Sequence, residues 1–271
     1  MAKVAFWSPD PAMTGNTHSI IAVSTLISIT HKTSSLLMHG NYDNKKIESS
    51  YTPYSELKES GAFSNSNIGV SALIRLATSN KLTSDAVQNY AKPVLKERLD
   101  VLYGMTQKDE DAYTDLVNSL TYISKKASEI YDLVFIDLPK DTNKKYVLDT
   151  LAESDIIVCV VNQDAVKLDS FFDTISKIEQ IKDKPKIFVI GDYEQRSKYN
   201  VQNIRLRYRT KDEIFIVPHN YIFSDACNDG NVINFFYNNI NADAKDYNGF
   251  FISQVSKIVE KIIEVAKIKD L

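Results

Sequence analysis

The sequence has few features of a secreted, metal-binding or membrane-spanning protein. It contains only two cysteines, Cys159 and Cys227, and they lie too far apart for a cysteine-based metal site. Cys159 falls within an apolar run, so we expect a buried, reduced thiol there. The four histidines lack metal-ligand spacing, and no apolar run approaches the ~20 residues that a membrane span needs. Because no signal-peptide pattern precedes the first apolar strand, we expect a cytoplasmic protein.

The sequence also lacks a large excess of charge of either sign. The formal net charge is −3 at pH 7, so the overall field does not attract nucleic acid, and any such contact needs a local basic patch. With 271 residues the chain is long enough for one large α/β domain. No repeat or linker marks a boundary, so we expect a single domain over residues 1–271.

Strand-like and helix-like runs alternate along most of the chain. The expected strands are 3–8, 34–38, 100–103, 133–138, 156–161, 186–190 and 213–217. The expected helices are 16–30, 68–79, 84–90, 109–130, 143–152, 168–181, 201–209, 232–238 and 250–269. Most strands are continuously apolar, which is typical of a sheet covered on both faces. The pattern predicts an α/β fold with a doubly wound, mostly parallel sheet flanked by helices, and with ligands at the carboxyl ends of the strands. Residues 39–66 show no clear periodicity, which fits either a mobile switch loop or an ordinary long loop.

The end of the first strand carries the most informative pattern. An apolar strand runs into a tight loop in which Gly15 and Thr17 open a helix. This is the layout of a phosphate-binding loop, where backbone N–H groups hold phosphate and the threonine hydroxyl reaches Mg²⁺. The strand 133–138 carries Asp137 near its end, where a carboxylate can hold Mg²⁺ directly or through water. A simple glycine turn would explain residues 15–17 alone, but the two elements together favour a nucleotide site with Thr17 and Asp137 at the metal.

The order and spacing of these segments resemble the ParA/MinD family of deviant Walker ATPases, which position plasmids, chromosomes, division sites, flagella and pili. The likeness extends to 99–104, 152–158, the adenine-contacting segment 188–199 and the proline-containing strand exit 216–220. Residues 68–95 resemble TadZ-like pilus-localisation members. The resemblance implies a P-loop NTPase-like fold of the SIMIBI/MinD type, with ATP or ADP and Mg²⁺ as ligands. It assigns nucleotide contacts to Thr14, Gly15, Asn16, Thr17, His18, Gly191, Asp192, Tyr193 and Pro218.

The loop departs from the family pattern Lys-Gly-Gly-x-Gly-Lys-Thr. Counting back from Thr17, Pro11 takes the place of the signature lysine and Asn16 that of the Walker lysine, while Ala12 and Met13 replace two glycines. In the family the signature lysine reaches across a dimer to the partner's nucleotide. Losing both cations should cost several kcal/mol of transition-state stabilisation, by analogy with the ~10³–10⁵-fold effect of an arginine finger. We therefore expect weak or absent ATP hydrolysis, with nucleotide binding left open.

Three further positions bear on this site. Gly191 stands where many relatives carry an adenine-reading asparagine. Lys140, just after the Asp137 strand, fits either a replacement cation or a solvated loop lysine. Asp10 is placed by the resemblance where it could approach the partner of a dimer.

The resemblance implies two surfaces for partners. Residues 196–211 carry six basic side chains and no acid, which fits either non-specific DNA binding through phosphate contacts or a solvated basic face. These residues are Arg196, Lys198, Arg205, Arg207, Arg209 and Lys211. The last expected helix, 250–269, has one apolar stripe with lysines mostly off it. Core packing of this helix is favoured over membrane contact.

The leading hypothesis is a cytoplasmic ParA/MinD-like scaffold, associated with nucleoid or membrane, that forms a homodimer over its P-loops. It would localise DNA or a pilus or secretion assembly through a partner protein. The alternatives are a slow ATPase of plasmid or chromosome partition, with its lysines replaced from elsewhere, and a pseudo-ATPase interaction module that binds no nucleotide. Met13 filling the phosphate cradle would favour the module, whereas an open cradle with unpaired N–H groups would favour nucleotide binding.

Overall fold

The structure is a computed structural model. It describes residues 1–9, 13–41, 45–62, 68–105, 110–139 and 145–268, and the side chains of all of these except 110–118.

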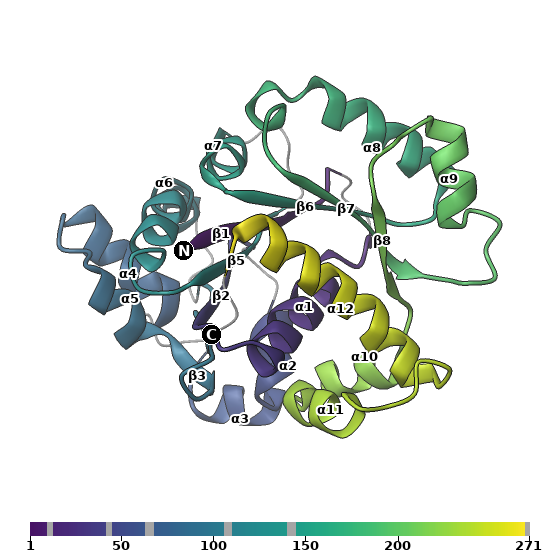
Figure 1. The fold of residues 1–271 in the computed structure, drawn as a ribbon. Coiled ribbons are helices and arrows are strands. Elements are labelled where there is room, and N and C mark those ends of the chain that lie inside the picture. The colour runs from purple at the N-terminus through teal and green to yellow at the C-terminus, as the bar shows by residue number, and fades with distance from the viewer. Residues whose placement is uncertain (10–12, 42–44, 63–67, 106–109, 140–144, 269–271) are drawn as a thin grey trace.

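An eight-stranded sheet forms the centre of the protein, in the order β3-β4-β2-β5-β1-β6-β7-β8 (Figure 1). The strands are β1 (Ala2–Trp7), β2 (Ser35–His39), β3 (Lys92–Leu95), β4 (Leu99–Val101), β5 (Leu133–Asp137), β6 (Ile156–Val161), β7 (Lys186–Tyr193) and β8 (Ile214–Pro218). All neighbouring strands pair in parallel except β3, which runs antiparallel to β4. The predicted doubly wound, mostly parallel α/β fold is confirmed.

Helices cover both faces of this sheet. On one side lie α1 (Asn16–Thr30), α2 (Lys46–Tyr51), α3 (Tyr54–Glu59), α10 (Tyr221–Asn228), α11 (Val232–Asn239) and α12 (Tyr247–Ala266). On the other lie α4 (Gly69–Thr78), α5 (Ser84–Tyr90), α6 (Glu110–Ala127), α7 (Lys145–Glu153), α8 (Ala165–Lys177), the short 3-10 helix η1 (Glu179–Ile181) and α9 (Val201–Tyr208). Successive residues of β1 point to opposite faces, so Val4 and Phe6 enter one core while Ala5 and Trp7 enter the other. This explains why the strand reads as continuously apolar.

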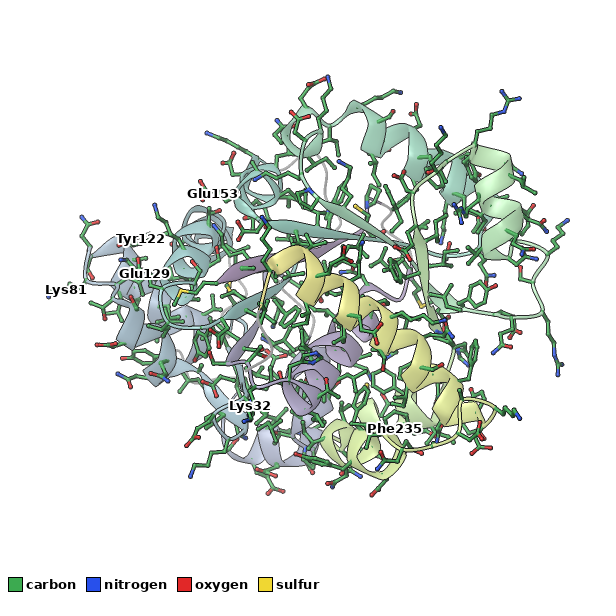
Figure 2. All side chains as sticks on the ribbon, in the orientation of Figure 1. Lys32, Lys81, Tyr122, Glu129, Glu153 and Phe235 are labelled. Carbon is green, nitrogen blue, oxygen red and sulfur yellow. The ribbon has the colours of Figure 1, made fainter. Side chains whose placement is uncertain are left out.

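Side chains fill the space between the sheet and the helices (Figure 2). Phe235 packs in an aromatic cluster with Phe223 and Phe251, whereas Lys81 and Glu129 lie exposed at the periphery. The stripe of α12 contributes buried side chains to the same core, so the favoured prediction of core packing for the last helix is confirmed. Within the described residues, no helix has both the length and the apolar character needed to cross a membrane.

The sequence expectations missed four elements. Residues 39–66, expected to lack regular structure, contain α2 and α3 in their described part. Helix α10 and the edge strand β3 were likewise not predicted. Helix α8 begins three residues earlier than the expected 168, because Asp164 caps it by accepting hydrogen bonds from the N–H groups of Val166 and Lys167.

Candidate functional site

The loop between β1 and α1 presents the N-terminus of α1 at the carboxyl end of the sheet. Gly15 is the N-cap residue, with a left-handed φ of 77° that glycine adopts without strain. In the part of the loop that the structure describes, no side chain caps the helix and no acid lies in its first turn. A helix N-terminus without a capping side chain is a common setting for binding phosphate.

Asp137 lies beside this helix, because β5 pairs with β1 and places Asp137 opposite Phe6. One carboxylate oxygen accepts a hydrogen bond from the Asn16 amide at 2.7 Å, and the other accepts one from the Thr17 hydroxyl at 2.8 Å. The same amide also donates to the Phe6 carbonyl at 3.3 Å. The Asn16 side chain therefore binds groups of β1 and β5, whereas a lysine at this position of a P-loop reaches the β- and γ-phosphates.

The Asp137 carboxyl is almost fully buried, and that burial raises its pKa despite hydrogen bonds from Thr17, Asn16 and Asn41 and the nearby charge of His39. Burial therefore outweighs the groups that favour the carboxylate. A cation held between Asp137 and Thr17 would favour the carboxylate further.

The oxygen atoms of Thr17 and Asp137 fit the ligand preference of Mg²⁺, which usually takes one or two protein oxygens and keeps water and phosphate as its other ligands. The described residues contain no group of three or more His, Cys, Asp or Glu residues that could hold a metal ion. Three buried polar atoms of the loop have no hydrogen-bond partner: Thr14 Oγ1, Asn16 Oδ1 and His18 Nε2. Unpartnered buried polar atoms are rare in native proteins, so this cluster fits a loop that receives a polar ligand together with Mg²⁺.

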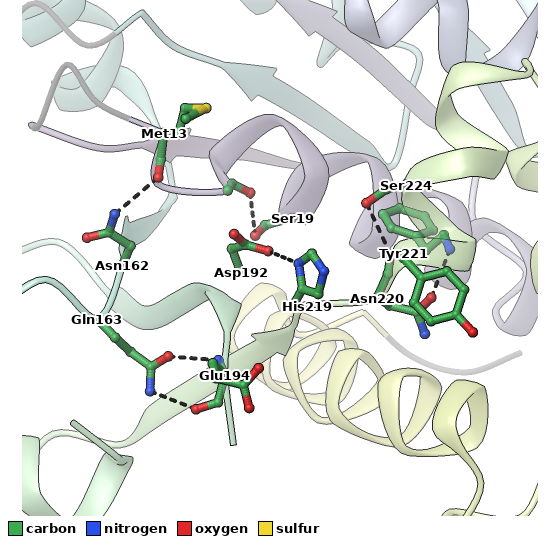
Figure 3. Close-up of polar contacts among 12 residues, drawn as sticks. Met13, Ser19, Asn162, Gln163, Asp192, Glu194, His219, Asn220, Tyr221 and Ser224 are labelled. Carbon is green, nitrogen blue, oxygen red and sulfur yellow. Dashed lines mark hydrogen bonds and ion pairs between the residues drawn. The ribbon is translucent and has the colours of Figure 1, made fainter. Parts of the chain in front are cut away.

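A cleft of about 530 Å³ opens in front of the loop. Its described lining residues are Met13, Thr14, Gly15, Asn16, Thr17, His18, Lys46, Asp192, His219 and Ser224. Met13 is 89% exposed, and its carbonyl accepts a hydrogen bond from the Asn162 amide at 3.1 Å (Figure 3). Met13 therefore does not fill the phosphate cradle, which was the arrangement expected to favour a module without nucleotide.

Gly191 lies against the backbone of the loop. A Cβ atom on Gly191 would lie 2.3 Å from the Thr14 carbonyl oxygen, and one on Gly15 would lie 2.9 Å from the Asp192 nitrogen. The two glycines therefore allow the backbone of the loop to lie directly against the end of β7. Gly191 therefore packs directly against the loop, and its predicted contact with a nucleotide stays a prediction.

A second cavity, of about 310 Å³, adjoins the cleft and shares His219 with it. It is lined by Tyr193, Glu194, Gln195, Arg196, Pro218, His219, Tyr247 and Phe250. Tyr193 and Pro218, both expected near the base, thus face one cavity. Their assignment to a nucleotide stays a prediction.

His219 and Asp192 meet where the two cavities join. The His219 Nδ1 atom lies 2.6 Å from an Asp192 carboxylate oxygen (Figure 3). The hydroxyl of Tyr247 donates to the His219 carbonyl and accepts from the Tyr221 N–H. His219 and Tyr247 are not among the residues predicted for the site, although the position of His219 directly after Pro218 indicates that it lies near the cleft.

The basic residues of the segment 196–211 do not act alike. Arg207 forms a two-pronged ion pair with Asp169 of α8, at 3.0 and 3.1 Å, and is thereby engaged within the protein. All six side chains are exposed, so Arg207 differs from the others by its ion pair and not by burial; the other five are Arg196, Lys198, Arg205, Arg209 and Lys211. Asp10, Pro11, Ala12 and Lys140 lie outside the described residues.

Both cysteines are buried and free, as expected for Cys159, and burial raises the pKa of each thiol to about 12. Neither offers a reactive thiolate near neutral pH.

Comparison with known proteins identifies the fold. No protein-family model matches the sequence, and no curated protein matches it. Among solved structures, the chain is similar to the septum site-determining protein MinD of Pyrococcus horikoshii in complex with Mg-ADP, with a TM-score of 0.70, 12% identity and 98% of both chains covered. It is also similar to a plasmid partition protein of Borrelia burgdorferi bound to AMPPNP, with a TM-score of 0.65, 15% identity and coverage of 97% of this chain and 98% of that one. A third similar structure is MinD in the MinC:MinD complex of Aquifex aeolicus, with a TM-score of 0.65, 13% identity and coverage of 97% and 96%.

These likenesses show that the chain has the fold of MinD and of plasmid partition proteins over nearly its whole length. Identities of 12–15% carry the fold and not the chemistry.

Proposed function

We propose that residues 1–271 form one ParA/MinD-like positioning or partitioning domain, which binds a magnesium nucleotide, dimerises over its P-loop and acts mainly as a scaffold. The observation that carries this proposal is the Thr17–Asp137 contact of 2.8 Å at the N-terminus of α1, which no side chain caps in the described loop. The contact brings together two oxygen atoms of the kind that bind Mg²⁺, whose remaining ligands would be water and phosphate. The P. horikoshii MinD and the B. burgdorferi partition protein, which share the fold, were solved with Mg-ADP and AMPPNP respectively.

Weak or absent hydrolysis is the second part of the proposal. Asn16 stands in the Walker lysine position, and its amide donates hydrogen bonds to Asp137 and to the Phe6 carbonyl. The side chain is neutral, so it supplies no positive charge to a phosphoryl group. A bound Mg²⁺ would supply charge to the β- and γ-phosphates. The residues of this chain would bind and orient the nucleotide, with the helix N-terminus holding phosphate and Tyr193 and Pro218 bordering the base.

The test is calorimetric titration of ATP and ADP, each with and without Mg²⁺, combined with light scattering and a phosphate-release assay. We expect Mg²⁺-dependent binding, ATP-dependent doubling of mass and little phosphate release. Thr17→Val should abolish the Mg²⁺ dependence. Thr30→Val is the matched control, because Thr30 lies in the last turn of the same helix, where its hydroxyl donates to the Leu26 carbonyl and contacts the His31 Nδ1 atom.

Two other results would each favour one of the alternative functions. No binding at millimolar nucleotide would favour a pseudo-ATPase interaction module. Steady phosphate release that Thr17→Val abolishes would favour a slow partition ATPase.

DNA is the partner that the exposed basic residues of the segment 196–211 favour. Arg205 and Arg209 are both exposed, at the end of α9 and just beyond it, and a non-specific site needs only such phosphate contacts. Changing both to glutamate should lower affinity for random duplex DNA and flatten its salt dependence. Arg207→Ala is the matched control, since the Arg207 guanidinium is paired with Asp169. Equal affinity of the double variant and the unmodified protein would refute DNA binding through this segment.

A further inference from the structure

Asp192 is the one acidic residue among the described residues that line the cleft. Its backbone has a left-handed φ of 51°, which is uncommon for a residue other than glycine. The pairing of β7 with β8 shifts register between Ile190 and Tyr193, so Asp192 lies at an irregularity of the strand. Irregularities of this kind change the direction of a side chain and are frequent beside functional sites. The backbone therefore takes an unusual conformation where the Asp192 carboxylate lines the cleft.

His219 orients this carboxylate. The His219 Nδ1 atom lies 2.6 Å from one Asp192 oxygen (Figure 3), and because a carboxylate only accepts hydrogen bonds, Nδ1 carries the proton. The backbone of His219 is held in turn. Its N–H donates to the Tyr193 carbonyl at 2.9 Å, and its carbonyl accepts from the Tyr247 hydroxyl at 3.2 Å. The ends of β7 and β8 therefore fix the Asp192–His219 pair at the cleft.

The Asp192–His219 pair can still form hydrogen bonds with a ligand. Within the part of the chain that the structure describes, the second Asp192 oxygen and the His219 Nε2 atom have no hydrogen-bond partner. The two side chains are 59% and 53% exposed, so a molecule in the cleft can reach them. A carboxylate repels phosphate groups but accepts hydrogen bonds from hydroxyls. The part of a ligand that suits Asp192 is therefore a hydroxyl-bearing part and not its phosphates.

The position of the pair indicates which part of a nucleotide it would meet. Asp192 adjoins the phosphate loop, since its backbone nitrogen lies 2.9 Å from the point that a Cβ atom on Gly15 would occupy. His219 lines both the cleft and the second cavity, which Tyr193 and Pro218 also line. In every nucleotide the sugar joins the phosphate to the base. A nucleotide with its phosphates at the loop and its base in the second cavity would therefore have its sugar beside Asp192.

We propose that the Asp192 carboxylate, oriented by His219, accepts hydrogen bonds from the ribose hydroxyls and so selects ribonucleotides over nucleotides that lack these hydroxyls. This proposal rests on the nucleotide binding proposed above. An acidic side chain on a ribose hydroxyl serves the same purpose in dinucleotide-binding folds. A site built to bond a hydroxyl rejects the analogue without it, because its own polar groups are then left unpaired. The ligand class that follows is a ribonucleoside di- or triphosphate.

The experiment is calorimetric titration of Mg-ATP and of its 2′,3′-dideoxy analogue, which lacks both hydroxyls. The unmodified protein should bind Mg-ATP at least about 10-fold more tightly, the usual effect of a hydrogen bond to a charged group. Asp192→Gly should bind both ligands as the unmodified protein binds the analogue, and glycine adopts the left-handed φ without strain. Asp229→Gly is the matched control, because Asp229 is an exposed acid at the end of α10 that lines neither cavity. It should keep the preference for Mg-ATP.

Two further variants complete the test. Asp192→Asn replaces Asp192→Gly if that variant does not fold, because asparagine also tolerates a left-handed backbone. It should lower the preference for Mg-ATP by about threefold or more, since a hydrogen bond to a neutral acceptor is roughly half as strong as one to a carboxylate. His219→Ala should lower the preference as well, because the carboxylate loses the donor that orients it. An unchanged preference in His219→Ala would overturn the role of His219.

The outcomes separate this proposal from the one it rests on. If the unmodified protein binds neither ligand, the proposed function fails and takes this assignment with it. If the unmodified protein binds both ligands with affinities within about twofold of each other, the nucleotide site stands and recognition of the ribose is overturned. A preference for Mg-ATP that persists in Asp192→Gly would overturn the role of Asp192, because another group then recognises the sugar. An equal loss of affinity for both ligands would also overturn it, because a general distortion of the cleft explains that result.

Discussion

Replacing Asp137 by asparagine should stabilise the folded protein while removing its Mg²⁺-dependent nucleotide binding. The carboxyl is buried with a raised pKa, so ionised Asp137 opposes folding at neutral pH. The sign follows from linkage: the unfolded chain, with the lower pKa, binds fewer protons than the folded protein, so stability rises as pH falls through the folded-state pKa toward that of the unfolded chain. Asparagine removes the charge and keeps the shape.

The hydrogen bonds can survive this change. The asparagine oxygen still accepts from the Asn16 amide, and its NH₂ group can donate to the Thr17 hydroxyl, which also has acceptor lone pairs. We expect a gain of about 0.5–2 kcal/mol in the free energy of unfolding, as is common when a functional compromise is removed. The melting temperature should rise by a few degrees.

The assay is urea and thermal unfolding of both proteins at pH 7.5 and at pH 5, without nucleotide. The advantage of the variant should shrink as the pH is lowered, because the raised pKa favours protonation of Asp137 in the folded protein. Asp100→Asn is the control, because burial also raises the pKa of Asp100. Asp100 lies in β4, away from the cleft, and its carboxylate accepts a hydrogen bond from the Tyr131 hydroxyl at 2.6 Å. Asp100→Asn should leave nucleotide binding unchanged. A less stable Asp137→Asn protein at pH 7.5 would refute the argument that burial dominates at this carboxyl.

Three further changes test separate parts of the structure. Gly191→Ala should cost about 1–3 kcal/mol of unfolding free energy and weaken nucleotide binding, because the added Cβ would lie 2.3 Å from the Thr14 carbonyl oxygen. A variant with native stability would show that the loop moves freely. Glu48→Gln leaves His39 buried beside a neutral group and should cost roughly 3–5 kcal/mol in urea unfolding. The attraction between Glu48 and His39 outweighs the effect of burial, so the pKa of Glu48 is lowered and that of His39 is raised. The loss of unfolding free energy should therefore be largest between pH 4.5 and 6.5, where the stabilising contributions of both ionised side chains are complete. A loss that does not change with pH would contradict this explanation. Met13→Ala should change stability by less than about 0.5 kcal/mol and leave nucleotide affinity unchanged, because Met13 is 89% exposed; tighter binding by the variant would show that Met13 occludes the cleft.

The sequence predicted the parallel part of the sheet because burial on both faces leaves a strong local signal. Strands such as β1 and β6 consist almost entirely of apolar residues, and both are fully buried. The missed elements have no such signal. Helices α2 and α3 have six residues each, and each buries one large apolar side chain, Ile47 and Leu57. Helices this short depend on tertiary contacts that a linear pattern cannot show.

The same distinction applies to the site. Thr17 and Asp137 were predictable because each follows a strand at a recognisable spacing, and adjacent strands place them together. The path of the Asn16 amide was not predictable, since it depends on which of several acceptors lies nearest in the folded chain. Helix α10 did carry an unused local signal in Asn220, whose side chain accepts from the Phe223 N–H and caps the helix.

The amide of Asn16 donates to the Asp137 carboxylate and carries no positive charge. A lysine in this position of a P-loop reaches the β- and γ-phosphates instead. A nucleotide bound at this loop would therefore have its phosphate charge compensated by Mg²⁺ at Thr17 and Asp137 and by the N-terminus of α1, without a cation from residue 16.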